Sequence, residues 1–159
     1  MIQVGDPLPT IPLRRLKGSV IEKIDLNDRI KGKKVILFAV PGAFTPTCSE
    51  IHLPSFIKEA DALKAKGIDE IFCIAVNDPY VLDVWEKASY AVGKVTLLSD
   101  SIGEFTKAIG LMMEENPVLG LRSKRYVAVL EDGIVKALLV EPNASNCTIT
   151  CAENIVDML

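Results

Sequence analysis

The part of this sequence best suited to chemistry is residues 41–50, which read Pro-Gly-Ala-Phe-Thr-Pro-Thr-Cys-Ser-Glu. Thr45 is a favourable N-cap residue, and Pro46 suits the first position of a helix, so Cys48 falls in the first helical turn. The unpaired backbone N–H groups and the positive end of the helix dipole favour an anion there, and the thiolate is the nucleophilic form of cysteine. The sequence therefore predicts a reactive thiol at Cys48 rather than an inert apolar side chain.

A buried strand is expected immediately before this cysteine. Residues 35–40 form a continuous apolar run that ends at Pro41, which is typical of a strand buried on both faces. A helical pattern closed by Gly67 and a second apolar run at residues 71–76 complete a β-α-β unit. Ligands bind at the carboxyl ends of parallel strands, so Cys48 lies where a substrate would be expected.

The remaining elements follow the same alternation of strands and helices. Asp132 and Gly133 separate two apolar runs, which favours a tight β-hairpin. The other expected elements are an N-terminal hairpin within residues 7–24, helices at 79–91, 101–109 and 151–159, and strands at 95–98, 126–131 and 134–141. Together they predict an α/β, thioredoxin-like fold with an N-terminal hairpin extension and a helical insertion, in one domain spanning residues 1–159.

Composition and charge exclude several classes of partner. The chain is 49% hydrophobic, but no apolar run approaches the roughly 18 to 20 residues of a membrane span. The net charge is −3 and the basic residues are scattered among acids, so neither a membrane nor a nucleic acid is expected as a partner. The first residues lack the features of a secretory signal, which predicts a cytoplasmic protein, or an organellar one if a presequence is removed.

Apart from Cys48, the chain has one histidine and three further cysteines that could bind a metal or exchange disulfides. His52 is the only histidine, so no multi-histidine metal site is expected, and we interpret it as a packed or hydrogen-bonded helix residue. Cys73 lies within an apolar strand, which predicts a buried, unreactive thiol. Cys147 and Cys151 stand four residues apart near the C-terminus, after a polar stretch, and are better placed for thiol exchange.

The Pro-Gly-Ala-Phe-Thr-Pro-x-Cys-Ser motif, followed by His-Leu-Pro, resembles the active-site signature of the peroxiredoxin-5, or type II atypical, peroxiredoxins. The likeness extends from about residue 4 to residue 159 and includes the segments 76–79, 121–126 and 132–137. The resemblance implies that Cys48 is the peroxidatic cysteine and that Thr45 offers its hydroxyl to the sulfur and the peroxide. It also implies that Pro41 shields the thiolate and that Arg125 holds the anion. Composition alone favours a different interpretation, in which Arg125 is a solvated surface charge in a cluster with Arg122 and Lys124.

The same resemblance implies a thiol-dependent peroxidase that reduces hydrogen peroxide and alkyl hydroperoxides through a sulfenic acid, with no metal, haem or flavin cofactor. It further implies recycling by thioredoxin or by glutaredoxin and glutathione, and assembly as a homodimer. Two other functions remain open. A peroxide-responsive redox sensor or holdase would use the same thiol without steady turnover, whereas a disulfide oxidoreductase would need a second thiol close to Cys48.

The cysteine that resolves the sulfenic acid is not settled by the resemblance. One branch of the group uses a cysteine near the C-terminus, but its position falls at Ile149 when the chain is aligned without gaps. Another branch carries a cysteine equivalent to Cys73. Because a buried strand residue would have to unfold to reach Cys48, we expect Cys151 to be the resolving thiol, followed by Cys147 and then Cys73.

Overall fold

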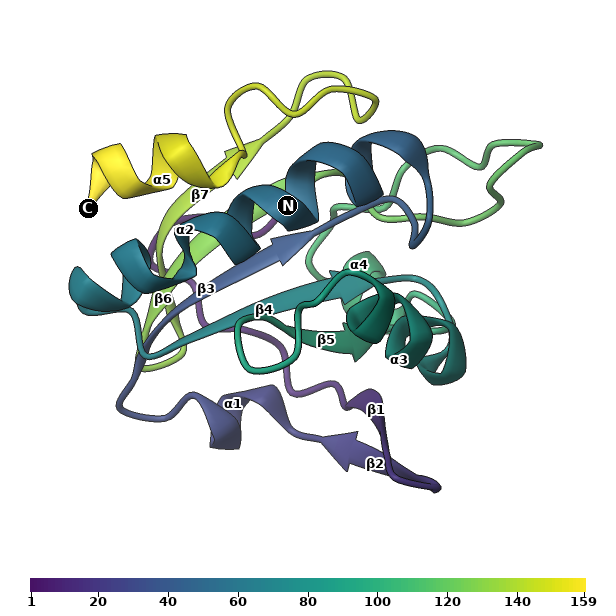
Figure 1. The fold of residues 1–159 in the computed structure, drawn as a ribbon, viewed down its shortest axis with the longest axis horizontal. Coiled ribbons are helices and arrows are strands. Elements are labelled where there is room, and N and C mark those ends of the chain that lie inside the picture. Colours follow the sequence, from purple (N-terminus) through teal and green to yellow (C-terminus); the bar gives the residue numbers. More distant parts are fainter.

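Seven strands form one mixed sheet at the centre of the computed structural model, which describes all of residues 1–159 (Figure 1). The strand order is β2-β1-β5-β4-β3-β6-β7. The neighbours β3, β4 and β5 are parallel, and the other neighbouring pairs are antiparallel. The strands are β1 (Leu13–Lys17), β2 (Val20–Ile24), β3 (Lys34–Ala39), β4 (Glu70–Ala75), β5 (Thr96–Ser99), β6 (Tyr126–Glu131) and β7 (Ile134–Val140). The predicted α/β architecture is confirmed.

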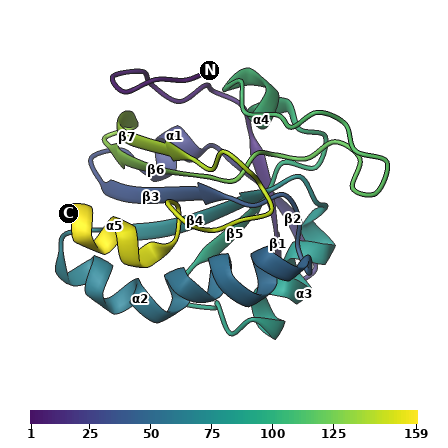
Figure 2. The same ribbon diagram turned by 90° about the horizontal axis from the view of Figure 1, so that it is seen from above.

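Helices cover both faces of this sheet (Figure 2). The helices are α1 (Leu26–Arg29), α2 (Leu53–Ala65), α3 (Pro79–Ala88), α4 (Glu104–Ala108) and α5 (Ala152–Met158). One face carries α2, α3 and α5 over a core of 21 buried residues that includes Cys48. The other face carries α1, α4 and the N-terminal segment over a core of 18 buried residues. None of the helices combines the length and apolar character needed to cross a bilayer.

Both predicted hairpins are present. The N-terminal hairpin does not lie against the body as a separate decoration, because Arg14 of β1 pairs antiparallel with Ser99 of β5 and so extends the sheet. In the second hairpin Asp132 and Gly133 have φ angles of 50° and 78°, the positive values that a two-residue type I′ turn requires. This second hairpin positions the site, because Arg125 is the residue immediately before β6.

The helix that carries Cys48 begins at Pro46 with an irregular turn. A π-helical turn, η1 (Cys48–His52), comes before α2, and the Leu53 amide donates to the carbonyl of Cys48, five residues earlier. Pro54 has no N–H to continue the normal pattern, so the distortion expected of a proline here takes the form of a wide turn. That turn carries Cys48 inward from the end of β3.

Candidate active site

Cys48 and Arg125 form a buried contact at the carboxyl end of β3. The Cys48 side chain is fully buried, and its Sγ accepts a hydrogen bond of 3.1 Å from Nη2 of Arg125. Arg125 is only 1% exposed, so its interpretation as a solvated surface charge is wrong. The positive charge of Arg125 is therefore held directly beside the sulfur of Cys48.

The orientation of Arg125 is set by acceptors from two further segments. Its Nε donates to the carbonyl of Ala144 at 3.0 Å, and its Nη1 lies 2.9 Å from Nδ1 of His52. Buried charged groups need such partners, because each unpaired donor would carry a desolvation penalty. All three nitrogens of the guanidinium are therefore engaged, and one of them points at Cys48.

His52 is a buried, neutral acceptor for this arginine. Burial, and then the positive charge of Arg125, lower the pKa of His52 from 6.5 to about 3. Because Nδ1 accepts from Arg125, the hydrogen-bond network assigns the proton to Nε2, which donates to the carbonyl of Thr150 at 3.1 Å. The ring packs beside a stacked pair of aromatics, with its centroid 4.9 Å from that of Phe38 and 5.6 Å from that of Phe56.

The sequence identified His52 as a hydrogen-bonded helix residue but did not identify its partner. The one available signal was its position four residues after Cys48, which places both side chains on one side of a helix. Its partner Arg125 lies 73 positions further along the chain, and local sequence patterns do not predict a contact at that separation.

An open pocket of about 530 Å³ lies directly above this buried contact. Pro41, Thr45 and Arg125 all line it, so the structure brings these three predicted residues together, with Cys48 beneath the pocket floor. The Thr45 hydroxyl donates to the carbonyl of Gly42 at 2.7 Å and makes no hydrogen bond to the Cys48 sulfur. The rest of the lining is Pro46, Thr47, Met113, Asn116, Val118, Leu119, Ala144 and Ser145.

Residues outside the pocket hold the loop before Cys48 in place. The backbone N–H of Ala43 donates to Oδ1 of Asn77 at 2.9 Å, which ties the loop to the end of β4. Trp85 is buried and donates from its indole to the Ser49 hydroxyl at 3.0 Å, so it is a core residue. Phe44 adopts a positive φ of 63° and remains 55% exposed beside the pocket.

The other three cysteines lie in two different environments. Cys73 is fully buried in β4, and burial, followed by the nearby Cys48, raises the pKa of its thiol well above the usual value. It is therefore a poor nucleophile in the folded state. Cys147 and Cys151 are joined to each other by a disulfide, in the segment between β7 and α5.

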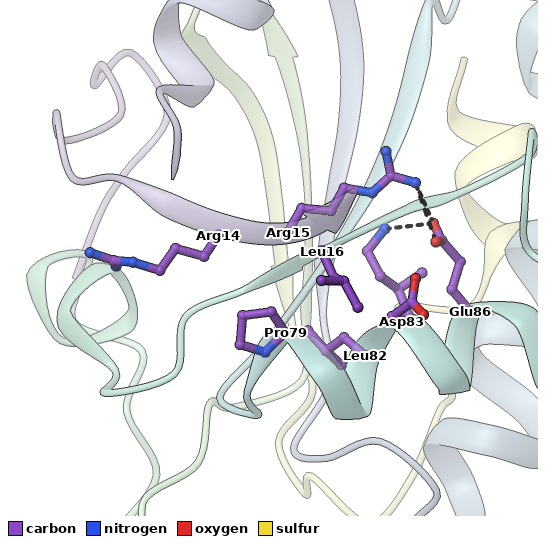
Figure 3. Close-up of a pocket in the computed structure, with 8 residues that line it drawn as sticks. Arg14, Arg15, Leu16, Pro79, Leu82, Asp83 and Glu86 are labelled. Atoms are coloured by element: carbon purple, nitrogen blue, oxygen red, sulfur yellow. Dashed lines mark hydrogen bonds and ion pairs between the residues drawn. The ribbon is translucent and has the colours of Figure 1, made fainter. Parts of the chain in front are cut away.

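A second hollow, between β1 and α3, is occupied by protein side chains (Figure 3). Arg15 lies 3.2 Å from Glu86, and Glu86 also accepts from the backbone N–H of Leu97. These contacts leave no free volume for a ligand. No group of three or more His, Cys, Asp or Glu residues is arranged to hold a metal ion. The pocket above Cys48 is thus the candidate active site.

Comparisons with known proteins identify the family of this chain. Residues 3–156 match the Redoxin family. The chain is 44% identical to Peroxiredoxin-2E, a chloroplastic protein of Arabidopsis thaliana, over 99% of this chain and 69% of that protein. It is 42% identical to Peroxiredoxin-2C of Oryza sativa, over 99% and 98% of the two chains.

A solved structure shows the same architecture. Reduced Prx3 of Vibrio vulnificus, in complex with hydrogen peroxide, superposes with a TM-score of 0.94 and 43% identity, over 99% of this chain and 96% of that one. The fold, the buried cysteine and arginine, and these relatives agree with one another. The chain belongs to the type II peroxiredoxins of the Redoxin family, which are thiol-dependent peroxidases.

Proposed function

We propose that Cys48 is the peroxidatic nucleophile of this peroxidase. Its thiolate attacks one oxygen of a hydroperoxide, the O–O bond breaks, and the sulfur becomes a sulfenic acid while water or an alcohol leaves with a proton. The observation that carries this proposal is the 3.1 Å contact between Cys48 Sγ and Arg125 Nη2, directly below an open pocket. A related protein has been solved in complex with hydrogen peroxide, which supports the substrate class.

Three residues of the pocket assist this reaction in our proposal. Arg125 stabilises both the thiolate and the negative charge that develops on the leaving oxygen. Thr45 turns its hydroxyl from the carbonyl of Gly42 toward the bound peroxide, which competes for the same donor. Pro41 forms part of the wall and offers no backbone N–H, so it limits the access of water to the sulfur.

We further propose that Cys151 resolves the sulfenic acid, ahead of Cys147 and Cys73, and that thioredoxin is the reductant that restores the thiols. Cys73 ranks last because it is buried in β4 and its pKa is raised. Glutaredoxin with glutathione is the alternative reductant, and it would serve an enzyme in which Cys48 acts alone.

Replacement of the proposed nucleophile is the direct test. Cys48→Ser is expected to abolish peroxide reduction while the fold remains intact, because a neutral hydroxyl of similar size is not a nucleophile at neutral pH. Peroxide consumption is measured with a recycling reductant, and circular dichroism reports the fold. Retention of more than about a hundredth of the wild-type rate, a loss below about 3 kcal/mol, would rule out this role for Cys48.

Loss of the buried cation is expected to slow the first chemical step. Arg125→Ala removes the donor to Cys48, and the rate of peroxide attack should fall by a factor on the order of a hundred. Stopped-flow measurement of one turnover isolates this step from recycling. Lys124→Ala is the matched control, since Lys124 is the exposed neighbour of Arg125 in the chain and should leave the rate unchanged. Equal rates in the two variants would contradict the role of Arg125.

Acidification should destabilise the fold through His52. Its pKa is about 3 in the folded protein against 6.5 when unperturbed, so between these values the unfolded chain binds a proton that the folded one does not. The contribution of His52 to the free energy of unfolding is complete above pH 6.5. It is lost as the pH falls toward 3, by up to about 1.4 kcal/mol per pH unit.

Urea unfolding across this pH range measures the effect. His52→Gln is the control, because glutamine offers polar atoms at a similar distance but does not titrate. The variant should show a shallower decline of stability with acid than the wild type. The same slope in both proteins would show that another group is responsible.

We propose a homodimer that forms through the apolar surface around the active-site loop. Phe44, Val118 and Leu121 are 55%, 86% and 45% exposed, and the first two lie at or beside the pocket. Val118→Asp is expected to shift the protein from dimer to monomer in analytical ultracentrifugation. Val20→Asp, at another exposed valine, on the edge strand β2, should leave the mass unchanged. A monomeric wild-type protein would refute the proposal.

A further inference from the structure

Residues 144–152, which we call the cystine loop, lie across the helix that carries Cys48. The loop connects β7 to α5 and passes over the start of α2 (Figure 1, yellow). The Thr47 hydroxyl donates to the carbonyl of Ser145 at 2.7 Å, and His52 donates to that of Thr150 at 3.1 Å. The backbone N–H of Ala152 donates to the Ser55 hydroxyl at 3.1 Å. The Cys147–Cys151 disulfide is therefore held against the candidate active site.

We propose that Cys147 and Cys151 form a dithiol relay, which takes the oxidising equivalent from Cys48 and stores it as the Cys147–Cys151 disulfide. The external reductant then acts on this pair and not on a disulfide that contains Cys48. The inference rests on the proposed role of Cys48 as the peroxidatic thiol and assigns its oxidised product to a second redox site.

The position of Cys151 fits the first exchange. The residue before it accepts from His52 and the residue after it donates to Ser55, and both partners lie within one to two turns of Cys48. Cys151 is thus held on both sides by the same helix. Cys48 and His52 both belong to the η1 turn, and π-helical turns frequently occur at functional sites.

The disulfide is not needed to hold the loop. Glu141 already binds this segment through its carboxylate, which accepts from the backbone N–H groups of Thr148 and Ile149 and from the Thr148 hydroxyl. Although burial opposes the charge, these hydrogen bonds lower the pKa of Glu141, so the carboxylate remains ionised at neutral pH. A link across only four residues also removes little chain entropy from the unfolded state. A structural role for the disulfide would be largely redundant.

The two sulfurs differ in their access to solvent. Cys151 is only 8% exposed, whereas Cys147 is half-buried and so more accessible. A relay requires an inner thiol that reacts with Cys48 and an outer thiol that an external reductant can reach.

The exchange balances in two steps. The Cys151 thiol attacks the sulfenic sulfur of Cys48, so that a Cys48–Cys151 disulfide forms and water leaves. The Cys147 thiolate then attacks the Cys151 sulfur and displaces Cys48 as a thiolate, which Arg125 stabilises as the leaving group. The net result is reduction of one hydroperoxide and oxidation of two thiols to the Cys147–Cys151 disulfide. A dithiol of the thioredoxin type restores both thiols and leaves as its own disulfide.

The test begins with fully reduced enzyme and about one equivalent of hydrogen peroxide in the absence of reductant. Mass spectrometry after alkylation should find Cys147 linked to Cys151, with Cys48 and Cys73 as free thiols. Cys147→Ser should trap the Cys48–Cys151 disulfide. The Cys48→Ser variant should form the Cys147–Cys151 disulfide much more slowly than the wild type, because it lacks the thiol that reacts with peroxide.

Comparison of the first turnover with steady turnover distinguishes the relay from the reaction of Cys48 with peroxide. The double variant Cys147→Ser/Cys151→Ser should keep the rapid consumption of one equivalent of peroxide. Its steady turnover with thioredoxin should fall at least about tenfold, because removal of a group that takes part in the reaction typically costs at least this much in rate. Ile149→Ser, an exposed position within the same loop, is the matched control and should turn over normally.

The outcomes distinguish the two proposals. Normal thioredoxin-dependent turnover in the double variant, a Cys48–Cys73 link, or a lasting Cys48 sulfenate or glutathione adduct with Cys147 and Cys151 reduced would each overturn the relay and leave the role of Cys48 intact. Absence of the rapid phase in the wild-type enzyme would instead overturn the proposed role of Cys48.

Discussion

The buried contact between Cys48 and Arg125 is the interaction on which the rest of the site depends. A guanidinium that is 1% exposed is tolerated only if its donors are satisfied, and here they reach a sulfur, an imidazole nitrogen and a backbone carbonyl. Two of these acceptors, Cys48 and His52, belong to the η1 turn, and the third is the carbonyl of Ala144 after β7. The positive charge therefore organises the surrounding backbone and side chains.

The neutral state of His52 follows from this constraint. A protonated imidazole could not accept from Arg125 and would place two cations side by side in a dry environment, so burial and the arginine together lower its pKa. The same ring donates to Thr150, which connects the arginine to the cystine loop. A continuous chain of contacts thus runs from the reactive sulfur to the segment that contains the second pair of cysteines.

The fold brings these segments together through its strand order. β3 and β6 are antiparallel neighbours, so the end of β3, which leads to Cys48, lies beside the start of β6, which follows Arg125. The chain then returns from β7 across α2 before it forms α5, and this return path lays residues 144–152 over the site. Sheet topology, more than local loop structure, determines which side chains meet.

The sequence by itself determined most of the elements and the position of Cys48 in the first turn of a helix, because those depend on local patterns. Apolar runs predicted β3 and β4, the Asp132–Gly133 pair predicted the hairpin turn, and the residues around Cys48 predicted a helix start. The tertiary structure alone decided that Arg125 is buried and not solvated, that the Thr45 hydroxyl binds Gly42, and that His52 pairs with the arginine. It also decided that Cys147 and Cys151 are joined beside the site. These contacts form between residues that are distant in the chain and are buried together by the fold. The spacing of residues along the sequence does not predict such pairs.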